Sequence, residues 1–537
     1  MGGSRMIQRA RTVAIGGVAL ALLFVTVPST ALPAPGSLDP SFDGDGRVVT
    51  VPPDQWGYLP RAMTIDDAGG IIVTGATLNL ETQDEDIFLA RYRPDGVLDD
   101  SFGSSGIVTA DLGGDEGTFD VEVDPAGRIV VAGNSWTAGA FSAVVARFTS
   151  SGAPDVTFAS EGFLTTRFDG AQASASALEV LDTTQIIVAV GIWTTQEYDS
   201  RHSTIVRLNE NGSLDPTFGD GGVGELAPPN FGIADIAIDD QQRIVAGGST
   251  TSGHTDIVVL RYSATGTIDR AFGTDGWTRV DFADQSDYFS EIAIDGEGRI
   301  VGSAYVATGF PTSDDLGAIR LLPDGSRDRS FSDDGKVAID FGTQSDVGSG
   351  LALDRNDELI VVGSTPHNAV EREPNDFAVA RIAADGSIDR TFSGDGKVRT
   401  DFAGGWDSAF DAEIDADGNV VVTGLTRPPR SGYQFAGLIA IARYIGGPYG
   451  RDPRLAINDV GVKEGDRGRK TVHFEISLDE PPTTAVSVSV RGEFYASERD
   501  TNRVREELHF EPGETLKRVP VYVYGDLQRG EGIERYT

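Results

Sequence analysis

Short apolar runs separated by Asp/Gly turns recur through most of this 537-residue chain. Each period contains one run like GKVAIDF at 335–341, one like AIDGEGRIVGSA at 293–304 and one like DFAVARI at 376–382. The second kind is divided by its turn, where Asp and Gly tolerate positive φ, so each period predicts four short strands. We find no window with helical periodicity.

One motif marks every period. The pattern G-x-x-D-x-[STA]-F-x-x-x-G occurs seven times, with successive phenylalanines 54 to 61 residues apart. These phenylalanines are Phe42, Phe102, Phe158, Phe218, Phe272, Phe331 and Phe392. A long, nearly fixed period is typical of stacked supersecondary units. Seven units of four strands without helices predict an all-β fold, a seven-bladed β-propeller of four-stranded blades over residues 32–444. An open β-solenoid is the alternative.

The repeat resembles the delta-60 repeat, a propeller-like family of bacterial secreted proteins. The core G-x-[LI]-D-x-[ST]-F carries this resemblance, which covers residues 36–444. Pro154 and Arg327 depart from the Leu/Ile position. The resemblance implies a propeller architecture in an exported bacterial protein, and it implies little about activity.

The third run of each period ends in an arginine, and six of these arginines precede the Asp of the following motif by eight residues. The pairs are Arg91 with Asp99, Arg147 with Asp155, Arg207 with Asp215, Arg261 with Asp269, Arg320 with Asp328, and Arg381 with Asp389. The residues between them, such as those at 94–96, fit a three-residue hairpin loop with Gly in its left-handed position. We therefore expect the two side chains to lie opposite each other as an ion pair. The alternative is a ring of anion-binding arginines.

The seventh arginine, Arg443, is followed eight residues later by Arg451, and the unmatched motif Asp is Asp39. If the units close into one ring, residues 36–46 complete the last blade and Arg443 pairs with Asp39. Closure removes the exposed sheet edges that an open array would carry. The competing partner of Arg443 is Asp452, nine residues on.

The first residues have the order of a secretory signal peptide. Basic residues precede an apolar run at 13–27, and small residues follow at 29–31. This order predicts a cleaved leader over residues 1–31, and an uncleaved anchor is the alternative. We expect a secreted or cell-surface protein, monomeric and without a membrane span once the leader is cleaved.

Composition excludes several functions. The formal net charge is −38 and the chain has no cysteine. An acidic surface repels phosphate backbones, so we expect no nucleic-acid partner. Without cysteine there is no disulfide or thiolate metal site. The five histidines lack metal-ligand spacing, and no nucleophile elbow or phosphate-binding loop occurs, so the sequence predicts no catalytic residue.

Three Asp/Gly runs, at 43–46, 333–335 and 394–396, have the composition of calcium loops. They lack the further ligands and the distal Glu of an EF-hand loop. Turn chemistry explains these runs better than ion binding does.

A different pattern follows a Gly/Pro-rich linker at 445–454. Residues 455–537 alternate apolar and polar positions, as in a β-sandwich. The segments 462–466, 508–510, 512–515 and 525–526 resemble a Calx-beta domain, and the chain ends before that domain would be complete. The resemblance implies that acids at one end of the sandwich hold Ca²⁺, and the matching residues are Glu464, Asp500, Asp526 and Glu531. Ile533 departs from an acidic position, and a spacer without metal is the alternative.

Together these patterns predict an exported, non-catalytic binding or surface-interaction protein whose ligand is an unknown extracellular protein or glycan. The alternative is a propeller enzyme, a lyase or glycan hydrolase, with its site on the ring axis. A site-forming loop in one blade alone would favour the enzyme, whereas uniform blades favour a scaffold.

Overall fold

The computed structural model describes residues 34–447, apart from 52–55, 80–83, 169, 182–183, 195–201, 251–253, 284, 310–312, 343–344, 368–373, 403 and 429–436. Outside that range it describes residues 20–21, 24–25, 455–457, 460–461, 468–478, 486–493, 504–510, 514–525 and 535–536. The chain separates into two compact units, Pro33–Gly447 and a second made of Met1–Leu32 with Pro448–Thr537. Among the described residues, we find no helix that is long and apolar enough to cross a membrane.

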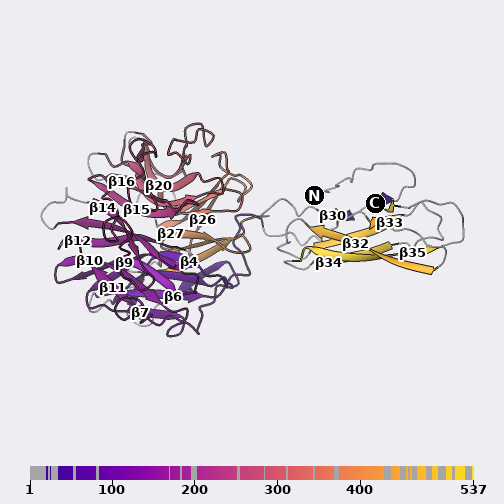
Figure 1. Cartoon of the computed structure of the whole chain (residues 1–537), viewed down its shortest axis with the longest axis horizontal. Coiled ribbons are helices and arrows are strands. Elements are labelled where there is room, and N and C mark those ends of the chain that lie inside the picture. Colours follow the sequence, from indigo (N-terminus) through magenta and orange to yellow (C-terminus); the bar gives the residue numbers. More distant parts are fainter. Residues whose placement is uncertain are drawn as a thin grey trace. The chain divides into compact units, whose positions relative to one another are not determined.

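The first unit is an all-β, seven-bladed propeller, as predicted (Figure 1). Blade 1 contains β4 (Trp56–Ile65), β5 (Ile71–Asn79), β6 (Glu85–Tyr92) and β7 (Ile107–Ala110), and blade 2 contains β8 (Asp115–Val123), β9 (Ile129–Thr137), β10 (Ala140–Phe148) and β11 (Phe163–Thr166). Blade 3 contains β12 (Gln172–Val180), β13 (Ile186–Trp193) and β14 (His202–Leu208), and blade 4 contains β15 (Phe231–Ile238), β16 (Ile244–Thr250), β17 (Ile257–Tyr262) and β18 (Trp277–Val280).

The remaining blades repeat this pattern. Blade 5 contains β19 (Tyr288–Ile294), β20 (Ile300–Gly309), β21 (Ser313–Leu321) and β22 (Lys336–Ile339). Blade 6 contains β23 (Val347–Leu353), β24 (Leu359–Pro366), β25 (Asn375–Ile382) and β26 (Lys397–Thr400). Blade 7 contains β27 (Trp406–Ile414), β28 (Val420–Arg427), β29 (Leu438–Tyr444) and, from the other end of the unit, β3 (Arg47–Thr50).

Strand β3 closes the ring as the sequence predicts. It pairs antiparallel with β29, in a register that sets Arg47 opposite Ala442. The Arg443 guanidinium contacts Asp39 at 2.7 Å, across about 400 residues of sequence. The prediction of closure is confirmed, and the competing Asp452 lies outside the described residues. Each blade therefore takes its outermost strand from the run after the following motif.

Blade 3 differs from the others in its outer edge. The corresponding segment forms a single bridge, between Val206 and Val223, in place of a fourth strand. It still runs beside β14, because the Gly224 N–H donates to Ile205 O at 2.7 Å and the Ala227 N–H to Ser203 O at 2.8 Å. Two prolines follow at 228–229, and proline cannot donate to a ladder.

Every motif phenylalanine is fully buried between blades. Phe218, for example, lies in one apolar cluster with residues of blades 3 and 4. The Arg207 guanidinium covers its ring at 4.7 Å, a cation–π contact. Gly266 of the next blade has a left-handed φ of +85°, and a Cβ there would lie 2.8 Å from the Phe218 ring. The motif therefore joins adjacent blades.

Replacing this buried ring gives a direct test of the packing. We expect Phe218→Ala to lower the free energy of unfolding by about 3–5 kcal/mol, because it removes a buried aromatic and leaves a cavity. Phe119→Ala is the matched control, because its ring is 39% exposed. Denaturant unfolding of both variants measures the difference. A loss below about 1 kcal/mol for Phe218→Ala would contradict the packing role.

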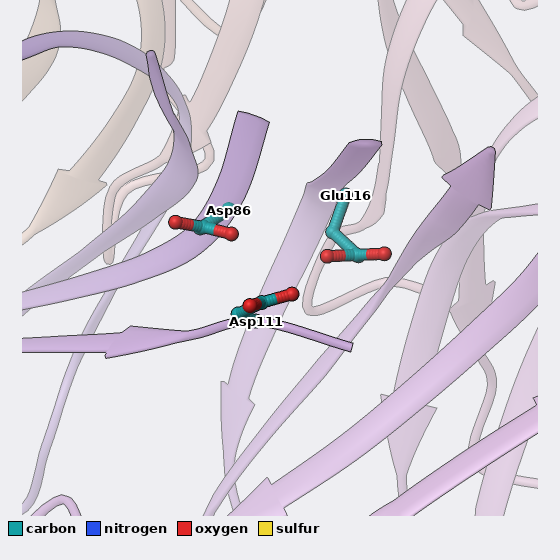
Figure 2. A group of neighbouring side chains, drawn as sticks. All are labelled: Asp86, Asp111 and Glu116. Atoms are coloured by element: carbon teal, nitrogen blue, oxygen red, sulfur yellow. The ribbon is translucent and has the colours of Figure 1, made fainter. Parts of the chain in front are cut away.

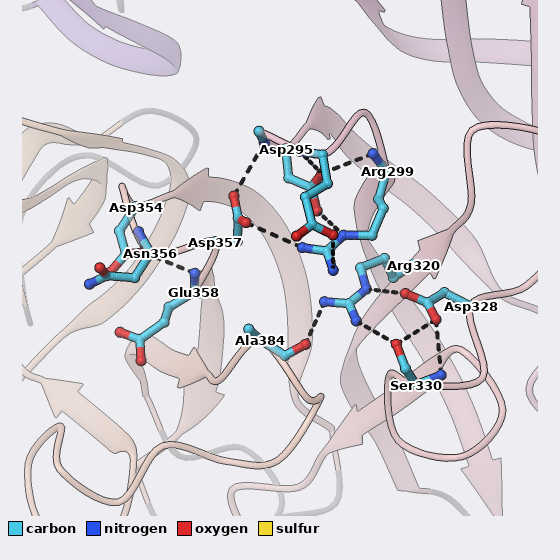
Figure 3. A network of polar contacts seen from close by, with 12 residues as sticks. Asp295, Arg299, Arg320, Asp328, Ser330, Asp354, Asn356, Asp357, Glu358 and Ala384 are labelled. Carbon is cyan, nitrogen blue, oxygen red and sulfur yellow. Dashed lines mark hydrogen bonds and ion pairs between the residues drawn. The ribbon is translucent and has the colours of Figure 1, made fainter.

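The motif arginines join adjacent blades and do not form an anion-binding site. We call each of these arginines, with its motif Asp, an Arg–Asp staple. Figure 3 shows Arg320, whose Nε donates to Asp328 Oδ2 at 2.8 Å and whose Nη1 donates to Ala384 O of the next hairpin at 2.5 Å. Equivalent contacts to the next blade are made by Arg91, Arg147, Arg207, Arg261 and Arg443. The predicted ion pairs are confirmed, and each arginine already has its anion.

Beyond the propeller, the described strands form small antiparallel sheets. One joins β30 (Leu455–Ile457), β32 (Gly468–Leu478) and β35 (Leu516–Gly525), and another joins β1 (Leu20–Ala21), β2 (Phe24–Val25) and β34 (Val504–Phe510) to β33 (Val486–Glu493). A third pairs β31 (Val460–Gly461) with β36 (Arg535–Tyr536). The incomplete Calx-beta sandwich stays a prediction.

Candidate functional site

The four predicted calcium ligands, Glu464, Asp500, Asp526 and Glu531, lie outside the described residues. Their role therefore stays a prediction. The described Asp/Gly runs of the propeller behave as turns, as expected. The side chains of Asp45, Asp334 and Asp395 each accept the backbone N–H two residues later.

Acids that the repeat pattern did not predict line the ring axis. The innermost strand of each blade contacts that of the next, and β27 contacts β4, so the seven innermost strands encircle the axis. Five of these strands carry one or two acids near a β-bulge. The acids are Asp120, Glu122, Glu179, Asp235, Glu291, Asp411 and Glu413, which we call the axial acids.

The axial acids hold their protons more tightly than free carboxylic acids do. Each of these side chains is half-buried. Burial is the first cause for every axial acid, and repulsion from other axial acids adds to it for all of them except Asp120. Burial raises the pKa of Asp120 to about 6, that of Glu413 to about 7, and those of Glu122 and Asp235 to about 8. The pKa values of Glu179, Glu291 and Asp411 are raised as well.

Several axial acids have a structural task. Asp120 accepts the N–H of Val121 at 2.7 Å and, from the next blade, that of Leu178 at 2.6 Å. Asp235 and Asp411 repeat this arrangement with Ile292 and Met63 as the next-blade donors. Both oxygens of these carboxyl groups are thus committed to backbone amides. They fix the bulges and join neighbouring blades around the axis.

A second set of acids lies between neighbouring blades. Figure 2 shows Asp86 of β6, Asp111 after β7 and Glu116 of β8, whose carboxylates point toward a common space. In each of three such trios, one carboxylate oxygen per residue lies within 4.8 Å of the others. The other two trios are Asp315 with Asp340 and Asp346, and Asp376 with Asp401 and Asp407. Three hard oxygen donors are a partial ligand set for a divalent cation.

The axial acids and the trios both follow sequence patterns, but these patterns can be recognised only once the fold is known. Six of the axial acids occupy positions two or four residues before a turn Asp, as Asp120 and Glu122 do before Asp124, and Glu179 lies three residues before Asp182. Each trio combines an Asp near the start of a third strand with a D-[FL] pair and an acid five or six residues after the Asp of that pair. These acids are distant in sequence, so their meeting depends on how one blade packs on the next.

The fold defines a seven-bladed β-propeller protein. Five of its segments match the family model described as "Domain of unknown function (DUF5122) beta-propeller", at 69–102, 125–158, 187–218, 243–272 and 356–392. Each matched segment ends at a motif phenylalanine. The family comparison therefore supports a propeller built from this repeat. No curated protein matches the chain.

Several solved structures are similar to the chain at low identity. A protein of unknown function from Dyadobacter fermentans is 12% identical, with 74% of this chain and 98% of that chain covered and a TM-score of 0.39. An α-L-arabinofuranosidase from Fusarium graminearum is 10% identical, with 74% and 97% covered and a TM-score of 0.37. A sialidase from Streptococcus pneumoniae is 11% identical, with 75% and 70% covered and a TM-score of 0.38. At these scores the likenesses carry no argument about activity.

Proposed function

We propose that this chain is an exported, non-catalytic binding or surface-interaction protein in which the propeller is a rigid scaffold. The observation that carries this proposal is the use of the axial carboxyl groups. Asp120, Asp235 and Asp411 bond to backbone amides of their own and the next blade, which is a structural arrangement. The recurrent Arg–Asp staples likewise give the motif arginines and aspartates a structural role. The ligand we expect is an extracellular protein or glycan.

The alternative is a propeller enzyme with its site at the axis, and one observation favours it. Glu122 and Glu413 have pKa values raised to about 8 and about 7, in the range that general acids and bases need near neutral pH. Perturbed carboxylic acids cluster at functional sites, and they also occur in structural networks. The binding function and the enzyme function differ in whether Glu122 and Glu413 are required for turnover.

One experiment separates the two functions. The full chain is applied to a glycan array and to purified bacterial cell-wall polysaccharide, and the same polysaccharides are assayed for new reducing ends and unsaturated products. We expect binding without turnover, and binding that Glu122→Gln with Glu413→Gln leaves intact. Turnover that this double variant abolishes, and that Asp67→Asn retains, would establish the enzyme instead. Absence of binding to any probe would refute the glycan form of the proposal.

We also propose that the C-terminal unit binds Ca²⁺ through Glu464, Asp500, Asp526 and Glu531, as the resemblance to a Calx-beta domain implies. Millimolar Ca²⁺ should then raise the unfolding temperature of that unit, since a ligand at a hundredfold excess over its Kd stabilises by about 2.7 kcal/mol. Calorimetry of the full chain with Ca²⁺ and with chelator measures the shift. A variant with all four acids replaced by their amides should lose it, and an unchanged transition in the parent chain would leave the spacer interpretation.

A further inference from the structure

The acidic trios between blades share one geometry. In each, a third strand supplies the first acid, the segment after the fourth strand supplies the second, and the next blade supplies the third. The third acid fixes this segment, because Asp346 Oδ2 accepts the Phe341 N–H at 2.8 Å and Asp407 Oδ2 accepts the Phe402 N–H at 2.8 Å. Glu116 Oε2 accepts the Leu112 N–H in the same way, at 3.0 Å. The three carboxylates are therefore held together by backbone contacts rather than by chance at a mobile surface.

The trio of Asp315, Asp340 and Asp346 has a second feature that points to a ligand. Asp315 is 4% exposed, and its Oδ2 accepts the Thr308 hydroxyl. Its Oδ1 is buried and has no hydrogen-bond donor among the described residues. A buried carboxylate oxygen without a donor loses its hydrogen bonds to water and forms no hydrogen bond within the protein to replace them. A cation at the trio would supply the missing partner.

The acids of a trio also repel one another. Burial raises the pKa of Asp86, and the carboxylates of Asp111 and Glu116 raise it further. The same causes raise the pKa of Asp315, where Asp340 and Asp346 contribute. Lys397 and Arg399 come near the second trio, but they donate to backbone carbonyls, those of Asp340 and Phe341. In the third trio, His367 contacts Asp376 at 3.0 Å.

A fourth position of the ring has an equivalent group with an arginine beside it. Asp256, Asp281 and Asp287 occupy the equivalent places between blades 4 and 5, and Asp287 Oδ2 accepts the Phe282 N–H at 2.8 Å. Here Arg279 forms an ion pair with Asp256 at 2.5 Å. In this group the Arg279 guanidinium lies beside the buried Asp256 carboxylate and supplies a positive charge.

We propose that the trios of Asp86, Asp111 and Glu116, of Asp315, Asp340 and Asp346, and of Asp376, Asp401 and Asp407 are Ca²⁺ sites between blades of the propeller. Hard carboxylate oxygens suit Ca²⁺, which takes six to eight oxygen ligands at flexible distances, with water completing the set. An ion held by acids of two blades would join those blades, as the Arg–Asp staples do. These sites are separate from the C-terminal ligands and do not depend on the proposed binding function.

The test counts bound ions in the full chain. The metal-stripped protein is dialysed against Ca²⁺ in physiological NaCl, and bound calcium is measured by atomic emission. We expect Asp111→Asn, Asp340→Asn and Asp401→Asn, combined, to bind three fewer Ca²⁺ than the parent, and each single variant to bind one fewer. The C-terminal acids are intact in all of these chains, so their contribution cancels.

Asp281→Asn is the matched control, because it changes the equivalent residue of the group that Arg279 neutralises, and it should leave the count unchanged. Melting in chelator shows whether each variant folds; if the combined variant does not, the single variants decide. Equal counts in the parent and the Asp→Asn variants would overturn the proposal. A loss in Asp281→Asn as large as in Asp340→Asn would overturn it too, because the effect would then be one of general surface charge.

Discussion

A chain that begins at residue 51 should fail to form a closed propeller and should aggregate, whereas a chain that begins at residue 32 should fold normally. The missing segment contains β3, which pairs with β29, and Asp39, which pairs with Arg443 at 2.7 Å. It also contains Phe42, which is fully buried against residues of blades 1 and 7. Its loss opens the ring and exposes an unpaired strand edge, a template for association with other chains.

Size-exclusion chromatography with light scattering measures the association, and denaturant unfolding measures stability. We expect a loss of several kcal/mol, because removal of a buried aromatic alone costs about 3–5 kcal/mol and strand pairing is lost as well. Asp39→Ala in the intact chain should have a smaller effect, since it removes the nearest carboxylate partner of the buried Arg443 guanidinium and leaves the longer contact to Asp415 at 3.6 Å. A monomeric chain from residue 51 with the parent's unfolding midpoint would show that the ring does not need this closure.

Closure could be predicted from sequence because its signal is local. The eight-residue spacing of arginine and aspartate reflects a hairpin, so the one unmatched pair, Arg443 and Asp39, identified the junction. The burial of Phe218 could be predicted for the same reason, because the motif sets the ring beside a tight turn in every copy.

The axial acids and the trios could not be predicted in this way. Asp120 meets Leu178, and Asp315 meets Asp346, only because one blade is rotated against the next. No spacing within a single repeat encodes that rotation. The irregular edge of blade 3 also escaped prediction, because the repeat continues through it and only the prolines at 228–229 signal the lost strand. The predicted calcium ligands of the C-terminal unit remain untested.

The second large effect concerns pH, and two sets of acids act in opposite directions. Asp215 represents the first set: backbone and hydroxyl donors at Thr217, with Arg207, lower its pKa to about 2. An acid with a lowered folded pKa stabilises the protein above its unfolded pKa, and this contribution is lost as pH falls through the folded value. The Arg–Asp staples therefore weaken only in strong acid.

The axial acids act at higher pH. Burial raises the pKa of Glu413 from 4.5 to about 7 and that of Glu122 from 4.5 to about 8. For an acid with a raised folded pKa, stability is fully present below the unfolded value and is lost as pH rises through the folded value. The window for this loss extends from about pH 4 to about pH 8. The propeller should thus be more stable in mild acid than in mild alkali.

We expect the free energy of unfolding to fall by several kcal/mol between about pH 5 and about pH 8.5, because each unit of pKa difference is worth about 1.4 kcal/mol and several acids contribute. Glu122→Gln with Glu413→Gln should flatten this dependence and stabilise the protein at the alkaline end, since the amides cannot ionise. Asp67→Asn, which removes an exposed carboxylate, should leave the slope unchanged. Denaturant unfolding across the pH range measures all three chains. Stability that rises from pH 5 to pH 8.5, or a slope that the double variant keeps, would show that the axial acids are ionised in the folded protein and that their repulsion is relieved by another partner.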